Sequence, residues 1–306
     1  MGRPLIESVP NISEGRRPGV IREIAEAAVG AGCWLVDVAS DADHNRSVIT
    51  LVGTSRGLPP GLVRLCEAAV ERIDLRTHQG AHPRMGAVDV VPLVPLGDAT
   101  MQECVELSRA LGQEIAARLD VPVILYEESA SAPHRRNLAA VRKGQFERLG
   151  ERLATPEWAP DYGPPAPHPS AGAVAVGARE TLVAFNVNLR TDDLKIAQRI
   201  AVAVRGSGGG LRYVKALGVP LEERGEVQVS MNLTNVRKTP IHRVLEMVER
   251  EAERLGVAVS DCEIVGKVPR FALYDTAAAT LRLRGFGAGA VLEECVEGAV
   301  NEDRGE

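Results

Sequence analysis

A short segment with two histidines is the clearest place for acid–base chemistry in this sequence of 306 residues. Residues 77–86 read Thr-His-Gln-Gly-Ala-His-Pro-Arg-Met-Gly, which puts His78 and His82 four positions apart, a spacing that helical zinc sites use. Gly80 and Pro83 oppose a helix there, and a proline biases the preceding residue toward extended dihedrals. We therefore expect no metal site, and we expect His82 to lie in an extended loop just before a strand.

An imidazole on a fixed loop suits general acid–base catalysis, because histidine titrates near neutral pH. A plain surface hydrogen-bonding role is the alternative for any loop histidine. The segment by itself leaves both interpretations of His82 open.

Composition and charge narrow the class of protein. With 45% hydrophobic residues the chain can bury a sizeable core, and its length predicts two compact units. We see no signal peptide and no apolar run long enough to cross a bilayer, so we expect a cytoplasmic protein without a membrane partner. The net charge of −5 gives no reason to expect a nucleic-acid partner. Five scattered cysteines without a C-x-x-C pair argue against a disulfide framework and a structural zinc site.

The hydrophobic pattern of the first half predicts alternating strands and helices. Strands are expected at residues 5–9, 34–38, 47–52, 87–94 and 121–126, and helices at residues 19–30, 60–73 and 101–119. The order is βαββαβ with one added helix and strand. It predicts helices packed against one face of a mostly antiparallel sheet.

The second half repeats the same order. Strands are expected at residues 181–189, 211–217, 227–233 and 262–268, and helices at residues 192–205 and 240–255. Thr239 is the expected N-cap of the second of these helices, with Pro240 at its first position. The repeat divides the chain into residues 1–177 and residues 178–306.

Residues 156–177 join the two halves and are rich in proline and glycine. This composition predicts neither a helix nor a central strand, and so long a loop is usually a linker or a binding segment. A passive linker is the simpler alternative. The aromatic side chains of Trp158 and Tyr162 are unusual in a chain with 3% aromatic residues.

Five separated motifs together resemble the formiminotransferase domain of the glutamate formiminotransferases. They are Val-Pro-Asn-Ile-Ser-Glu-Gly at residues 9–15, Asn45-Arg46, His-Pro-Arg-Met-Gly-Ala-Val-Asp at residues 82–89, Trp-Ala-Pro-Asp at residues 158–161, and Ala-Phe-Asn-Val-Asn-Leu at residues 184–189. They occur in the family's order, and the resemblance extends to about residue 273. Each motif is weak alone, and their combination is specific.

The resemblance implies an α+β fold of two ferredoxin-like βαββαβ (α/β-plait) subdomains packed around a central groove, usually in a homodimer. It also implies transfer of the formimino group of N-formimino-L-glutamate to N5 of tetrahydrofolate, which yields 5-formiminotetrahydrofolate and L-glutamate in histidine degradation. Tetrahydrofolate is then a co-substrate, and no metal is needed. Animal members carry a fused cyclodeaminase domain that this sequence does not show, so we expect a separate cyclodeaminase.

The resemblance also assigns site residues. His82 matches the catalytic histidine. The folate-binding stretch matches residues 163–172, which are Gly163, Pro164, Pro165, Ala166, Pro167, His168, Pro169, Ser170, Ala171 and Gly172. Further candidates for substrate binding are Asn45, Arg46, Arg84 and Arg190, the last two because guanidinium meets a carboxylate in a two-pronged geometry. Ordinary solvated side chains are the alternative for Arg84 and Arg190, and Arg46 could equally hold the first subdomain together.

Two positions depart from the animal pattern. Ala39 stands where those proteins have an acidic residue, which leaves the carboxylate that orients His82 open between Asp41 and Asp43. Ala171 replaces a larger aromatic residue, so stacking on the pterin would be arranged differently.

Two other functions remain open at this point. The same site could move a formyl group from 5-formyltetrahydrofolate to glutamate, or the chain could be a non-catalytic folate-binding protein. A titrating histidine at position 82 argues against simple binding. The sequence does not separate the two transfer reactions.

Overall fold

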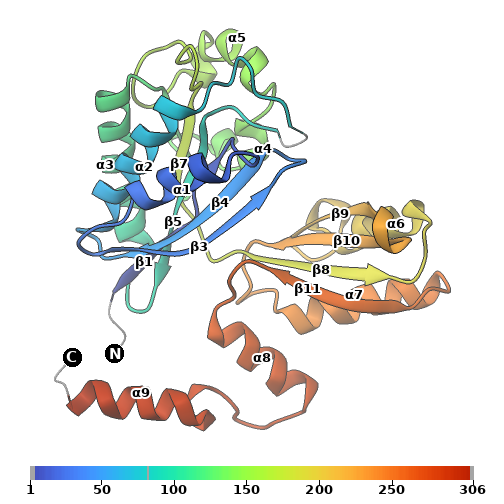
Figure 1. Ribbon diagram of the computed structural model, residues 1–306. Helices are drawn as coiled ribbons and strands as arrows, with labels where there is room; N and C mark the ends of the chain where they lie inside the picture. The colour runs from blue at the N-terminus through green and yellow to red at the C-terminus, as the bar shows by residue number, and fades with distance from the viewer. Residues whose placement is uncertain (1–3, 81–82, 304–306) are drawn as a thin grey trace. The chain divides into compact units, whose positions relative to one another are not determined.

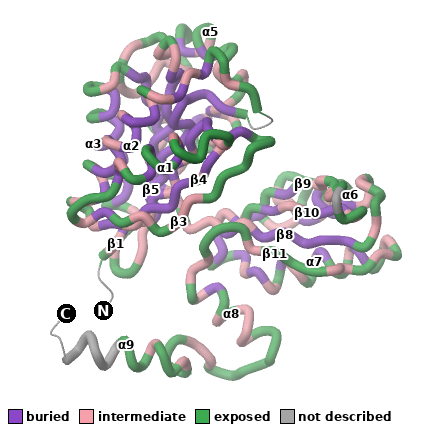
Figure 2. The backbone as a smooth tube through the Cα atoms, in the orientation of Figure 1, coloured by how far each residue is buried: buried purple, intermediate pink, exposed green. Residues whose placement is uncertain are grey.

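The computed structural model of the chain describes residues 4–80 and 83–303 (Figure 1). The chain forms two compact units, Met1–Glu180 and Thr181–Glu306. Each unit has its own sheet and its own buried core, seen as the purple strands in Figure 2.

The first unit begins with an antiparallel βαββαβ arrangement. Its elements are β1 (Leu5–Ser8), β2 (Asn11–Ile12), α1 (Pro18–Ala27), β3 (Cys33–Asp41), β4 (Arg46–Gly53), α2 (Leu58–Arg72) and β5 (Val88–Leu96). The short strands β1 and β2 both lie between β4 and β5, and β3 pairs with the far edge of β4. The predicted βαββαβ order is confirmed here.

Two parallel strands extend this sheet beyond β5. After α3 (Met101–Leu119) and β6 (Val123–Glu127), the chain returns as β7 (Val174–Ala178), which lies between β5 and β6. Our expectation that residues 156–177 contain no central strand is therefore wrong at their end. The prolines stop at Pro169, and the small apolar residues of β7 are buried on both faces, as in other parallel strands.

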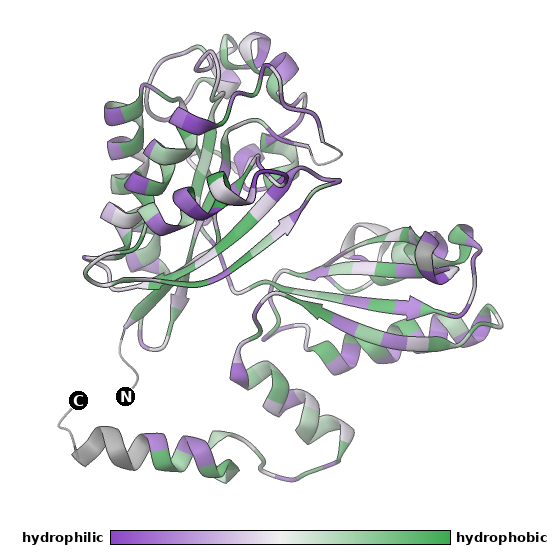
Figure 3. Ribbon diagram, in the orientation of Figure 1, coloured by the Kyte–Doolittle hydropathy of each residue, from purple (hydrophilic) through white to green (hydrophobic). Residues whose placement is uncertain are grey.

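Helices cover both faces of the first sheet, whereas we expected one face only. The strand side chains alternate: Val123 and Leu125 pack toward α1–α3, and Ile124 and Tyr126 pack toward the other face. That second face is covered by α4 (Leu138–Val141) and α5 (Leu149–Leu153), which contact the short helices η1 (Pro133–Arg135), η2 (Phe146–Arg148) and η3 (Pro156–Trp158). Figure 3 shows the helices as amphipathic, with apolar and polar stripes.

The second unit is a complete ferredoxin-like fold. Its elements are β8 (Val183–Leu189), α6 (Leu194–Val204), η4 (Gly206–Gly208), β9 (Val214–Leu221), η5 (Glu222–Arg224), β10 (Glu226–Leu233), α7 (Ile241–Arg254) and β11 (Val259–Val265). The antiparallel strand order is β11-β8-β10-β9. Apolar side chains of β8 and β10 pack on α6 and α7. Helix α8 (Arg270–Thr280), η6 (Ala288–Ala290) and α9 (Leu292–Asp303) follow.

Helix starts show how local sequence sets these elements. Thr100 and Glu103 form a reciprocal capping box, and α3 begins and ends where the sequence predicted. Asp193 caps α6 by accepting a hydrogen bond from the backbone N–H of Lys195. Thr239 does not cap α7, because Pro240 itself occupies the N-cap position and Thr239 is buried.

Three of the five cysteines, Cys33, Cys66 and Cys104, are buried in the first unit, and all five are free thiols. Burial raises the pKa of the Cys66 thiol to about 12, so it stays protonated as a small core residue. None of the helices in the described part of the chain is both long and apolar enough to span a membrane.

Candidate functional site

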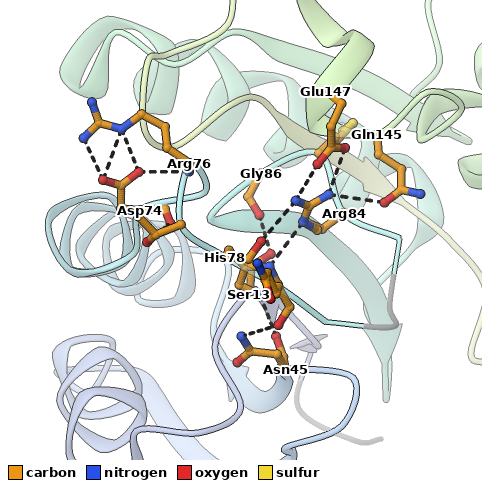
Figure 4. A network of polar contacts seen from close by, with 12 residues as sticks. Ser13, Asn45, Asp74, Arg76, His78, Arg84, Gly86, Gln145 and Glu147 are labelled. Atoms are coloured by element: carbon orange, nitrogen blue, oxygen red, sulfur yellow. Dashed lines mark hydrogen bonds and ion pairs between the residues drawn. The ribbon is translucent and has the colours of Figure 1, made fainter.

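The polar residues on either side of position 82 define the candidate site. His82 itself lies outside the described residues, as does Ala81. The site is therefore built from His78 and Arg84, which stand before and after that gap, and from the segments they contact (Figure 4).

Arg84 is a buried arginine whose donors are all engaged. Its Nε donates to Nδ1 of His78 at 3.2 Å, and its Nη2 donates to the backbone carbonyl of His78 at 3.4 Å. Its Nη1 donates to Oε1 of Gln145 at 3.3 Å, and both terminal nitrogens meet Glu147 in a fork, at 2.7 and 3.0 Å. Because a guanidinium carries five N–H groups, these five hydrogen bonds use its whole donor capacity.

The two partners of the His78 ring fix its tautomer. Nε2 lies 2.9 Å from the backbone carbonyl of Asn45, which can only accept, and Nδ1 receives the hydrogen bond from Arg84. The ring is thus neutral with its proton on Nε2. With both nitrogens engaged, His78 has no lone pair free for a metal ion.

Asn45 joins three loops of the first unit. Its Oδ1 accepts a hydrogen bond from the backbone N–H of Gly15 at 2.9 Å, and its Nδ2 donates to the carbonyl of Gln79 at 3.0 Å. Its own backbone is left-handed, at φ +48°, a conformation that asparagine tolerates better than most residues. Residues 9–15, 45–46 and 77–80 therefore meet at Asn45.

The proposed folate-binding stretch is joined to the residues that follow His82. Gly86 and Gly172 form an antiparallel bridge, and the backbone N–H of Ala87 donates to the carbonyl of Ala171 at 2.9 Å. Ser13 adds to this joint through a hydrogen bond from its Oγ to the Gly86 carbonyl at 2.7 Å. Three of the five motifs thus meet in the first unit.

The second half of that stretch is a tight turn closed by His168 and Gly172. Their backbones exchange hydrogen bonds of 2.8 and 2.9 Å, and Nδ1 of His168 accepts a third from the N–H of Ala171 at 3.0 Å. The neutral His168 ring therefore carries its proton on Nε2. The Ala171 side chain is buried in the core of the first unit, so it presents no surface to a ligand. Gly163, Pro165, Ala166 and Pro169 are exposed.

The Trp-Ala-Pro-Asp motif anchors this stretch to the sheet. Oδ2 of Asp161 accepts hydrogen bonds from the backbone of Leu125 at 2.7 Å and from Arg135 at 2.8 Å. The guanidinium of Arg135 also donates to the carbonyls of Glu157 and Ala159. Trp158 packs against Arg152, whose guanidinium carbon lies 3.4 Å from the ring centroid. These residues hold the backbone in place.

The two carboxylates proposed to orient His82 differ in their surroundings. Asp41 accepts hydrogen bonds from the backbone and from Nδ1 of His44, at 2.8 and 2.7 Å. Burial raises the pKa of Asp41, but the hydrogen bonds from His44 outweigh it and hold that pKa below its usual value. Asp43 is exposed in the same turn. Both carboxylate oxygens of Asp41 are thus hydrogen-bonded to His44.

Arg46 belongs to a partly buried charged group. Burial, followed by the charge of Arg142, lowers the pKa of its guanidinium, and Asp41 and Asp89 act in the opposite direction. Asp89 pairs with Arg142 and accepts a hydrogen bond from the backbone of Met85. The surroundings of Arg46 agree with the structural alternative that the sequence left open.

The motif at residues 184–189 lies on β8, and the candidate Arg190 follows that strand. Asn186 and Asn188 are buried, and they bind Glu263 and Asp261 on the neighbouring strand β11 through their side-chain amides. Arg190 follows β8 and is exposed, with its backbone N–H bound to the Ala258 carbonyl. Both asparagines of the motif at residues 184–189 are therefore engaged within their own sheet.

Three residues that contribute to this site, Gln145, Glu147 and Arg135, carry no local signal in the sequence. Gln145 and Glu147 bind Arg84, and Arg135 binds Asp161. In each pair the two residues are more than 20 positions apart, and no spacing rule connects them. Residues 4–80 and 83–303 contain no group of three or more His, Cys, Asp and Glu side chains that could hold a metal ion.

Comparisons with known proteins agree with these motifs. Residues 5–179 match the family described as formiminotransferase domain, N-terminal subdomain, and residues 184–285 match the formiminotransferase domain. A glutamate formimidoyltransferase of Streptococcus pyogenes is 49% identical over 283 residues, covering 92% of this chain and 95% of that protein. One from Thermoplasma acidophilum is 46% identical over 300 residues, covering 97% and 99%. The formimidoyltransferase-cyclodeaminase of Sus scrofa is 44% identical, but the match spans 52% of its length.

Proposed function

This chain belongs to the formiminotransferase family, and from that membership we propose that it is a glutamate formimidoyltransferase. The reaction moves the formimino group of N-formimino-L-glutamate to N5 of tetrahydrofolate, the co-substrate of this family. The observation that carries the proposal is the near full-length match to two proteins of that name, at 49% and 46% identity.

His82 is proposed as the proton carrier. N5 of tetrahydrofolate attacks the formimino carbon, and the tetrahedral intermediate then breaks its bond to the glutamate nitrogen. The attacking nitrogen loses one proton and the departing nitrogen gains one, so a single imidazole can serve both transfers. This role rests on the resemblance of residues 82–89 to the family's motif. Asp41 is bound to His44, so of the two orienting carboxylates considered we keep Asp43.

Residues 163–170 are proposed as the pterin-binding surface. Their support is the exposure of Gly163, Pro165, Ala166 and Pro169, and the backbone hydrogen bonds that tie Ala171 and Ala173 to Ala87 and Met85. His168 offers a donor at Nε2. Asn45 is assigned a positioning role, because its amide holds Gly15 and Gln79. Arg84 and Arg190 are proposed to bind the carboxylates of N-formimino-L-glutamate. Arg46 remains a weaker candidate for the same role.

One experiment tests the proposal directly. Purified protein is incubated with tetrahydrofolate and N-formimino-L-glutamate, and 5-formiminotetrahydrofolate and released L-glutamate are measured by mass spectrometry. A parallel reaction contains 5-formyltetrahydrofolate and glutamate. Turnover in the first reaction at a higher kcat/KM supports formimino transfer. Turnover in the second alone replaces it with formyl transfer, and folate binding without turnover replaces both with a binding protein.

We further propose a cytoplasmic homodimer. The support is the family resemblance, since the structure describes one chain. Light scattering during size-exclusion chromatography at several protein concentrations tests the dimer.

A further inference from the structure

The side of Arg84 that faces solvent is occupied by a carboxylate of the protein itself. The Arg84 side chain is 10% exposed, whereas that of its partner Glu147 is 59% exposed. Glu147 therefore covers the guanidinium from the solvent side. A ligand that approaches Arg84 from solvent meets Glu147 first.

The remaining contacts of Arg84 do not depend on Glu147. Its Nε and Nη2 are held by the ring and the carbonyl of His78, and the ring is held in turn by the Asn45 carbonyl. If the Glu147 side chain moves away, Arg84 keeps its hydrogen bonds to the ring and the carbonyl of His78 and to Gln145. These three hydrogen bonds hold in place the two N–H groups that Glu147 had bound. Arg84 thus keeps a preformed fork for a carboxylate, which lowers the ordering cost of binding one.

The backbone that carries Glu147 is unusual. Gln145, two positions before it, has φ +54° and ψ −162°, a region that residues with a side chain rarely adopt. Gly144 precedes it with φ +91°. The segment is fastened to Arg84 by the backbone N–H of Phe146, which donates to the Arg84 carbonyl at 2.9 Å. The strained turn therefore holds Glu147 next to Arg84 whether or not the two side chains are bonded.

We propose that Glu147 is a resident carboxylate at Arg84, which the carboxylate of the glutamate-bearing substrate displaces, so that Glu147 sets the affinity of this site. This inference rests on the proposed function, which gives Arg84 a substrate carboxylate. The chemistry matches, because the Glu147 side chain ends in the same group as the side chain of N-formimino-L-glutamate. Hydrogen bonding from Arg84 lowers the pKa of Glu147, which keeps it ionised and competitive at neutral pH.

Displacement predicts that removing the resident charge tightens substrate binding. An internal competitor reduces the apparent affinity by the fraction of sites it blocks, so Glu147→Gln should lower the KM for N-formimino-L-glutamate about fivefold. It should also lower the Kd of the full chain for L-glutamate and for glutarate, measured by calorimetry without the reaction. kcat should change less than KM. Glu151→Gln is the matched control, because Glu151 lies four positions after Glu147 and is an exposed glutamate paired with Arg148.

Each outcome decides between support and rejection. A lower KM and Kd in Glu147→Gln, with wild-type values in Glu151→Gln, supports displacement. Unchanged or raised values in Glu147→Gln overturn it, as does an equal fall in both variants, which would be a general charge effect. Arg84→Lys, which loses the fork, should raise the Kd for L-glutamate; an unchanged Kd removes Arg84 from the site and overturns the inference. Absence of any turnover of N-formimino-L-glutamate by wild-type protein is instead a failure of the proposed function.

Discussion

Gly86 and Gly172 face each other across an antiparallel bridge that leaves no space for a side chain on either residue. A Cβ atom on Gly172 would lie 2.1 Å from the carbonyl oxygen of Met85, and one on Gly86 would lie 2.0 Å from that of Ala173. The family motif at residues 82–89 and the proposed folate-binding stretch are thus parts of one joint. A change at this bridge should affect both.

Gly172→Ala should destabilise the protein strongly. The residue has φ +69°, and its new methyl group would meet backbone atoms that cannot move aside cheaply. Gly209→Ala is the control, because Gly209 has φ +90° with open space around it. We expect Gly209→Ala to cost roughly 1 kcal/mol for its backbone conformation and Gly172→Ala at least about 2 kcal/mol more. Urea unfolding measures both, and equal losses would contradict the close approach.

His82→Ala should abolish most of the catalytic activity and leave the affinity for tetrahydrofolate almost unchanged. A positioned acid–base group contributes about 10²–10⁴-fold to the rate, so kcat should fall by that factor. The Kd for tetrahydrofolate should stay within about threefold, because a proton carrier does not anchor the ligand. Added imidazole should restore part of the rate. A parallel loss of folate affinity would make His82 a binding contact, and a full residual rate would remove it from the mechanism.

Activity should not depend on a transition metal. Both ring nitrogens of His78 are bonded within the protein, to the Asn45 carbonyl and to Arg84, so His78 cannot join His82 in holding zinc without breaking that arrangement. Dialysis against a chelator should leave kcat within error, and elemental analysis should find less than one zinc per chain. Stoichiometric zinc that is lost together with activity would reverse this prediction.

The sequence predicted the secondary structure well because hydrophobic periodicity is a local signal. The capping box of Thr100 and Glu103 fixed the start of α3, and alternating apolar residues identified β8 and β10. The prediction failed at β7, where a proline-rich stretch continues into five buried residues. It also failed at α7, where Pro240 rather than Thr239 stands at the N-cap. Composition averaged over a long segment conceals a strand at its end.

The candidate site was predicted less completely than the fold. Motifs identified which residues gather around positions 82–89, but not what each residue contacts. The donors of Arg84 are used by Gln145 and Glu147, about 60 positions away, and no local pattern encodes such a pairing. Asp161 likewise belonged to a recognised motif, and only the structure shows its partner Arg135. Long-range polar partners depend on the tertiary fold.

Glu14→Gln should change how stability depends on pH. The Glu14 carboxylate accepts hydrogen bonds from the backbone of Arg16 and Arg17 and from the Arg17 side chain. Burial raises the pKa of Glu14, but these hydrogen bonds outweigh it and lower that pKa below its ordinary value of 4.5. The ionised form therefore stabilises the fold above pH 4.5, and this contribution disappears as the pH falls through the lower, folded-state pKa.

The wild-type protein should thus be more stable than Glu14→Gln by about 2 kcal/mol at neutral pH. The difference should shrink as the pH is lowered from 4.5 through the folded-state pKa of Glu14. Denaturant unfolding across this range measures it, with Glu26→Gln on the exposed face of α1 as a control that should change stability by less than about 0.5 kcal/mol. A difference that stays constant with pH would show that the Glu14 charge is not involved.

Neighbouring arginines provide a matched test of the anchor beneath the folate-binding stretch. Arg135 and Asp161 form an ion pair in which the side chains are 7% and 10% exposed, whereas the next pair, Arg136 and Glu128, is 54% and 40% exposed. Removing one partner of a buried pair leaves an uncompensated charge, so Asp161→Ala should cost about 3–5 kcal/mol. Glu128→Ala should cost no more than about 1 kcal/mol, because solvent screens the exposed pair.

The two variants should differ in function as well as in stability. Asp161 also accepts the backbone N–H of Leu125 on β6, and it lies two positions before Gly163, where the proposed pterin-binding surface begins. Losing that anchor frees the stretch at one end, so Asp161→Ala should raise the Kd for tetrahydrofolate at a temperature where the variant is still folded. Circular dichroism checks the fold, and fluorescence titration measures folate binding. If Asp161→Ala is folded and binds tetrahydrofolate as tightly as Glu128→Ala, the anchor does not serve the site, and residues 163–170 lose their main structural support as the folate-binding surface.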